Sequence, residues 1–142
     1  MQRHELSAED RLFRADFEAG VVARENFNHR AHVRLAYIYL AESDTAAAAA
    51  NMHRALLGFL QHHGIPASKY HETLTRAWIL AVRHFMESSP SPVSADAFIS
   101  HNPALLDSKI MLTHYSADLL FSDEARTQFV EPNLEQIPRH EP

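Results

Sequence analysis

The sequence predicts an all-α protein: a single compact helical bundle with four longer helices, short C-terminal helices and an extended tail. The chain has 142 residues, the size of one domain, so residues 1–142 are expected to form a single helical domain. Only three glycines occur, and alternating apolar and polar runs are scarce, which gives little support to strands. Alanine and leucine, two strong helix formers, are frequent.

Capping residues divide the chain into its predicted helices. The four longer helices are expected at roughly residues 8–19, 29–42, 44–63 and 69–88, with N-caps at Ser7, Asn28, Ser43 or Asp44, and Ser68. Gly20 suits the left-handed position after a helix end, and the Gly-Ile-Pro sequence at 64–66 cannot continue a helix. Shorter helices are expected after Ser94, Asn102 and Ser122, with a stiff loop at 89–92 and an extended tail from Glu131 to Pro142.

The composition excludes several classes of function. The net charge is −5, and because binding to phosphates requires clustered lysine and arginine, nucleic acid is not expected as a partner. The absence of cysteine excludes disulfides, thiolate catalysis, cysteine-ligated zinc and iron–sulfur clusters. No signal peptide and no membrane-spanning apolar run are visible, so a soluble, cytoplasmic protein without a membrane partner is expected.

Histidine is unusually frequent, with 11 residues, and three of these histidines are predicted to face the interior. On a helix over 29–42, His29 lies at the centre of the apolar face and His32 lies one turn further on, at its edge. His71 is expected in the first turn of the fourth helix, on its buried face. Burial and the positive end of a helix dipole both favour the neutral imidazole, which is the form that binds divalent metals.

These positions suggest a three-histidine metal site made of His29, His32 and His71, with Glu72 as fourth ligand or general base and His114 as a further ligand. The sequence does not choose among zinc, iron, copper, nickel and manganese as the divalent transition metal. Such an ion would polarise a substrate oxygen or activate water or dioxygen. The function expected first is therefore a small metalloprotein, a metal-dependent enzyme acting on a small molecule.

Other interpretations stay open beside the metal site. The inward histidines could be hydrogen-bonded core residues of a non-catalytic helical module that binds a ligand or partner. His71 or Glu72 could instead act as a base without metal. Lys69 and Tyr70 could place a cation and a phenol beside His71, which would suit an anionic substrate, or Lys69 could simply be solvated. A homo-oligomer through the alanine-rich third helix is also open.

Four segments of the chain carry a resemblance to a known group of proteins. They are Phe-Asn-His-Arg-Ala-His-Val-Arg-Leu-Ala at 27–36, Lys-Tyr-His-Glu-Thr-Leu-Thr at 69–75, His-Tyr-Ser at 114–116 and Phe-Val-Glu-Pro-Asn-Leu at 129–134. Together they resemble a family of small, mostly bacterial proteins of unknown function, over about residues 27–138. The resemblance implies that these segments are important, but it supplies no reaction.

Overall fold

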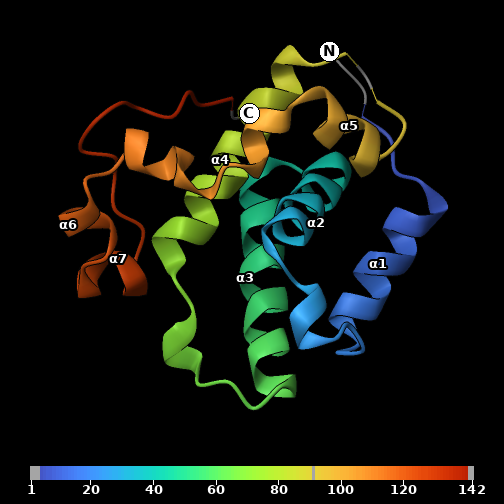
Figure 1. Ribbon diagram of the computed structural model, residues 1–142, viewed down its shortest axis with the longest axis horizontal. Helices are drawn as coiled ribbons and strands as arrows, with labels where there is room; N and C mark the ends of the chain where they lie inside the picture. Colours follow the sequence, from blue (N-terminus) through green and yellow to red (C-terminus); the bar gives the residue numbers. More distant parts are fainter. Residues whose placement is uncertain (1–3, 91, 141–142) are drawn as a thin grey trace.

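The computed structural model describes residues 4–90 and 92–140, and it confirms the all-α prediction. Helices α2, α3 and α4 pack against one another at the centre, and α1 lies against α2 and α3 (Figure 1). None of the described residues forms a strand. The helices are α1 (Ala8–Glu18), α2 (His29–Glu42), α3 (Thr45–His62), α4 (Glu72–Ser88), α5 (Ala95–His101), α6 (Ala117–Leu120) and α7 (Asp123–Thr127).

The predicted caps of the first three helices are confirmed. Ser7 and Asp10 form a capping box at the start of α1, and Gly20 after its end has the positive φ of 79° that favours glycine. Asn28 accepts a hydrogen bond from the Ala31 N–H at the start of α2. Of the two candidates for α3, the cap is Asp44, whose side chain accepts from the Ala47 N–H.

The predicted start of the fourth helix is wrong. Ser68 does not cap it, because residues 67–69 form a separate 3-10 turn and Tyr70 is extended. The N-cap is His71, which has extended backbone angles, and its ring Nδ1 accepts a hydrogen bond from the Leu74 N–H at 3.1 Å. His71 therefore precedes the helix instead of lying within its first turn.

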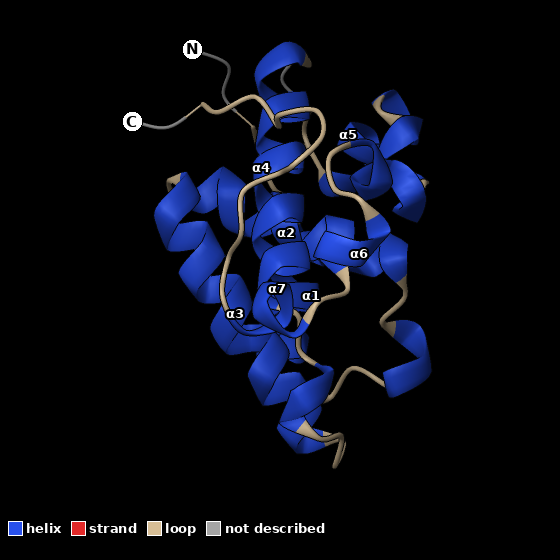
Figure 2. Ribbon diagram, turned by 90° about the vertical axis from the view of Figure 1, so that its left-hand side faces the viewer, coloured by secondary structure: helices blue, strands red, loops and turns tan. Residues whose placement is uncertain are grey.

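The C-terminal third forms short helices and a tail along α4 (Figure 2). Helix α5 is capped by Ser94 as predicted, and 3-10 helices cover residues 103–106 and 108–113. The tail over 130–140 is extended, with Ile137 buried and Leu134 N–H bonded to the His114 carbonyl. Two predicted segments are described only in part. Ser91, in the stiff loop predicted at 89–92, and residues 141–142, in the predicted extended tail, lie outside the described residues.

A buried carboxylate joins three helices on the side of the bundle where α1 lies. Asp10 is only 1% exposed; its Oδ1 lies 3.1 Å from Arg34 Nη2 of α2, and its Oδ2 accepts the Ala95 N–H of α5 at 2.9 Å. Burial alone would raise the pKa of Asp10, but the N–H groups of Ala95 and Ser7 and the Arg34 guanidinium lower it below its usual value. Asp10 is therefore an ionised anchor between α1, α2 and α5.

No helix among the described residues is both long and apolar enough to cross a membrane.

Candidate functional site

A pocket of about 360 Å³ lies between α2, α3 and the start of α4, and three of the predicted site residues line it. His29 and His32 come from the first turn of α2, and His71 comes from the cap of α4. Imidazoles from α2 and from the residue that precedes α4 thus line one pocket, although His71 reaches it from a capping position and not from within a helix. The remaining lining residues are mainly apolar or aromatic: Phe27, Leu56, Phe59, Leu60, Lys69, Tyr70, Leu74, Thr75, Trp78 and Ser108.

Both ring nitrogens of His71 are already engaged by the backbone. Nε2–H donates to the Leu120 carbonyl oxygen at 2.7 Å, and Nδ1 accepts from the Leu74 N–H at 3.1 Å. These partners assign the neutral tautomer with the proton on Nε2, and burial lowers the pKa of His71. The ring has no free lone pair in this arrangement, so it ties the start of α4 to the end of α6.

His29 keeps one nitrogen free. Its Nε2–H donates to the Leu105 carbonyl oxygen at 2.9 Å, which leaves the lone pair of Nδ1 without a partner among the described residues. The ring also packs edge-on against Trp78, with the ring centroids 4.7 Å apart. His29 is therefore a fixed hydrogen-bond acceptor beside the pocket.

His32 has no hydrogen-bond partner among residues 4–90 and 92–140. Burial, and then repulsion from His29, lower the pKa of His32 to about 4, so the ring is neutral near pH 7. Its centroid lies 6.4 Å from that of His29 and 6.0 Å from that of Phe27. A neutral imidazole offers one donor and one acceptor, and both are unused here.

Glu72 and His114 do not line this pocket. His114 ends a 3-10 helix, and its Nδ1–H donates to the Glu135 carbonyl oxygen at 2.6 Å, so it contacts the tail and not the interior expected from an α-helical register. Within the described part of the chain, no group of three or more histidine and carboxylate side chains is placed to hold a metal ion. The ligand and general-base roles of these residues stay predictions.

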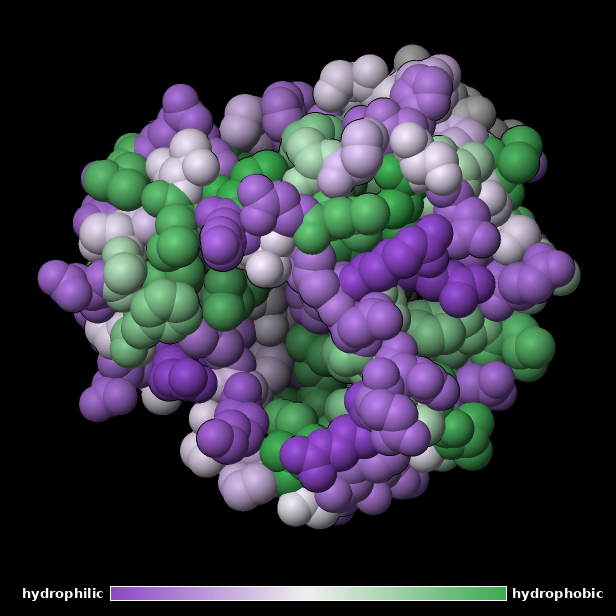
Figure 3. Space-filling view, viewed as in Figure 1, coloured by the Kyte–Doolittle hydropathy of each residue, from purple (hydrophilic) through white to green (hydrophobic). Residues whose placement is uncertain are grey.

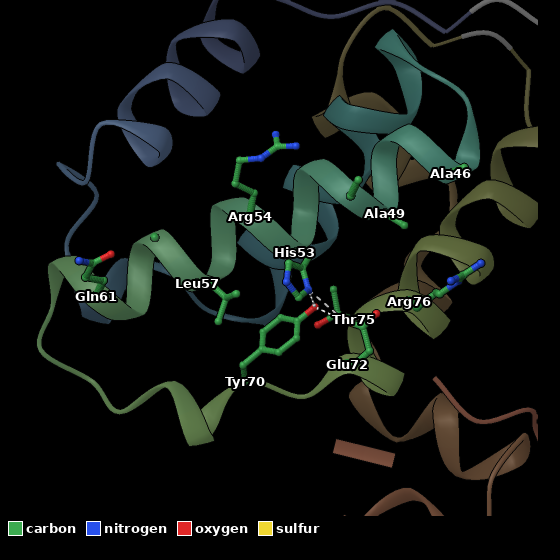
Figure 4. Close-up of a pocket in the computed structure, with 12 residues that line it drawn as sticks. Ala46, Ala49, His53, Arg54, Leu57, Gln61, Tyr70, Glu72, Thr75 and Arg76 are labelled. Atoms are coloured by element: carbon green, nitrogen blue, oxygen red, sulfur yellow. Dashed lines mark hydrogen bonds and ion pairs between the residues drawn. The ribbon is translucent and has the colours of Figure 1, made fainter. Parts of the chain in front are cut away.

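Glu72 instead belongs to a cluster that the sequence did not predict, in a neighbouring groove of about 680 Å³. Its Oε1 accepts the Tyr70 hydroxyl at 2.6 Å and lies 3.1 Å from His53 Nδ1 (Figure 4). The molecular surface is hollowed between α3 and the start of α4 (Figure 3). His53 is half exposed, and its contact with Glu72 links α3 to α4 across the groove.

Tyr70 separates the groove from the pocket, because it lines both. Burial, and then the hydrogen bond to Glu72, raise the pKa of Tyr70 well above its usual value, so its hydroxyl stays protonated and keeps donating to Glu72. The phenol is therefore a wall of the pocket with its polar end turned to the groove. In the sequence, only the closeness of Tyr70 and Glu72, two positions apart, points to this cluster.

Comparisons with protein-family models, with curated proteins and with solved structures found no match. The family resemblance carried by the four sequence segments stays a prediction.

Proposed function

We propose that the protein binds a small planar organic acid in the pocket between α2, α3 and α4. The observation that carries this proposal is His32, a neutral ring on the pocket wall whose donor and acceptor are unused among the described residues. The ring is only partly exposed and its nitrogens open onto the pocket, so a bound ligand can reach them. A ligand that supplies both partners would exchange them for water, and each such hydrogen bond contributes about 1 kcal/mol net.

The apolar lining favours a flat, apolar ligand body. Phe27, Phe59 and Trp78 surround the pocket together with leucine side chains, and aromatic walls pack well against planar rings. The volume of about 360 Å³ lies at the lower end of the range for small-molecule sites. These features favour a ligand with one ring or a fused pair of rings.

The polar groups define the two ends of the ligand. Lys69 lines the pocket and is exposed, and no ion pair of its side chain occurs among the described residues, so it can pair with a carboxylate near the opening. At the α2 end of the pocket, His29 offers only the Nδ1 lone pair, and His32 offers either an acceptor or a donor. A hydroxyl group on the ligand fits this end, because it can donate to one imidazole and accept from the other.

Trp78 provides a direct assay, because it is the only tryptophan of the chain and it lines the pocket. We would titrate the protein with 4-hydroxybenzoate, with benzoate, which lacks the hydroxyl, and with 4-hydroxybenzamide, which lacks the charge. The proposal predicts a saturable change in tryptophan fluorescence, with 4-hydroxybenzoate binding most tightly. Loss of either polar group should weaken binding by about tenfold, the cost of one unmade hydrogen bond or ion pair.

A pair of variants locates the binding. His32→Leu keeps an apolar pocket but removes both hydrogen bonds, so 4-hydroxybenzoate should bind about tenfold more weakly. His101→Leu, on the exposed end of α5, is the matched control and should bind as the parent protein does. A signal that rises without saturation, or equal affinities in the two variants, would rule out the proposed site.

The second candidate function is a metal-dependent enzyme in which His29 and His32 bind a divalent transition metal. One observation favours it: both rings hold a lone pair that no described residue uses, on the same pocket wall. Neutral imidazole suits zinc, copper, nickel, iron and manganese, and water would occupy the open positions. Equilibrium dialysis with Zn²⁺, followed by element analysis, should then show that His29→Leu and His32→Leu each bind one ion fewer per chain than the parent protein.

A further inference from the structure

A second pair of histidines lies outside the pocket, where the C-terminal tail meets α4. His84 projects from α4, and His140 lies in the tail, 56 residues further along the chain. His84 Nδ1 and His140 Nε2 are 2.9 Å apart, and the two rings lie 5.1 Å apart with an interplanar angle of 19°. The two residues are far apart in the sequence, so this pairing arises from the tertiary fold.

We propose that His84 and His140 form a divalent-metal site that fastens the C-terminal tail to α4. Zinc binds imidazole nitrogen at about 2.0–2.1 Å. Two nitrogens 2.9 Å apart can therefore share one ion as adjacent ligands after only small side-chain adjustment. In the structure these two nitrogens form a hydrogen bond, so one of them carries a proton. Binding of an ion requires that proton to move to the other nitrogen of its ring, so that both facing nitrogens present lone pairs.

The surroundings of the pair suit a metal ion. Both histidines are partly buried where the tail meets α4. Glu87 lies one helical turn beyond His84 on α4, within reach of the same face, although it now pairs with Arg83. With two imidazoles and no thiolate, the chemistry favours Zn²⁺, Cu²⁺ or Ni²⁺, and water would complete the coordination.

The tail is held close enough for such a site to form. Ile137 is 4% exposed and anchors the tail in the core, and Arg139 pairs with Glu131 at 2.9 Å. A metal bound by residues this far apart in sequence stabilises the folded state, because only the folded chain holds both ligands together. The function of the site would be to hold the tail over 130–140 against α4 when metal is present.

The test uses Zn²⁺ and the full chain in the His32→Leu background, so that the pocket contributes no ligand pair. Calorimetric titration should show one bound ion, and His84→Ala should weaken binding by about tenfold or more. His101→Ala, which changes an exposed histidine of α5, is the control and should keep the affinity. No heat of binding, or the same affinity after His84→Ala, would overturn the proposal.

Trypsin gives an independent readout, because it cleaves after Arg139, next to the proposed ligand His140. Zn²⁺ should slow the release of residues 140–142 several-fold in the protein that retains His84, since local opening must first break the metal bond. In the His84→Ala variant, Zn²⁺ should leave the rate unchanged, which also controls for any effect of the metal on the protease. Equal protection in both proteins would place the ion elsewhere.

Discussion

The low pKa of His32 makes the stability of the protein depend on pH in a way that one substitution should remove. Burial and the neighbouring His29 lower the pKa of His32 from 6.5 in the unfolded chain to about 4. The unfolded chain therefore binds this proton at higher pH than the folded protein does. Between the two pKa values the unfolding free energy therefore rises with pH. The stabilisation that His32 contributes at neutral pH is fully lost only when the pH has fallen below both pKa values.

The size of the effect follows from the two pKa values. The whole difference corresponds to about 3 kcal/mol of unfolding free energy. About 2 kcal/mol of it should be lost between about pH 7.5 and about pH 5, because the unfolded ring is then almost fully protonated and the folded ring is not. His32→Gln keeps a polar side chain that is neutral at every pH, so this variant should lack that loss.

Urea unfolding of both proteins at the two pH values measures the effect. Burial also lowers the pKa of His71, and both burial and the nearby His140 lower that of His84, but these groups are present in both proteins and cancel in the comparison. The parent protein should lose about 2 kcal/mol more than His32→Gln on acidification. If both proteins lose stability equally, His32 is not the neutral, partly buried ring on which the proposed site depends.

Three further substitutions test the fold around the pocket. Asp10→Ala leaves Arg34 without its buried partner and should lower the unfolding free energy by about 3 kcal/mol in urea denaturation. A change within experimental error would show that Asp10 does not hold α1, α2 and α5 together. Gly20→Ala places a Cβ at a positive φ and against the ring of His62, so it should cost more than about 1 kcal/mol by the same method, and a neutral result would contradict that close approach. His71→Ala removes the cap of α4 and the bond to the end of α6, which should cost about 2 kcal/mol and lower the melting temperature; an unchanged melting temperature would show that neither bond matters.

The sequence predicted most of the helix boundaries because caps act locally. Ser7, Asn28, Asp44 and Ser94 each bond a backbone N–H three residues further along the chain, so their role is readable from neighbouring residues alone. The start of α4 was missed because a histidine ring, which is seldom a capping group, takes this role in place of Ser68.

The candidate site was predictable only in part. Helix periodicity located His29 and His32 correctly, because the face of a helix follows from spacing. The partners of the histidines did not follow, since Leu105 and Leu120 bond to rings 76 and 49 residues away, and nothing local specifies such contacts. The link between His53 and Glu72 likewise depends on how α3 and α4 pack.

The most direct test of the account is a long-range ¹H–¹⁵N spectrum of the imidazole rings, recorded with and without 4-hydroxybenzoate. We expect the ring nitrogens of His32 to shift strongly on binding, while those of His71, whose nitrogens already have backbone partners, stay nearly unchanged. Ligand-induced shifts confined to other histidines, with His32 unmoved at saturating ligand, would contradict it.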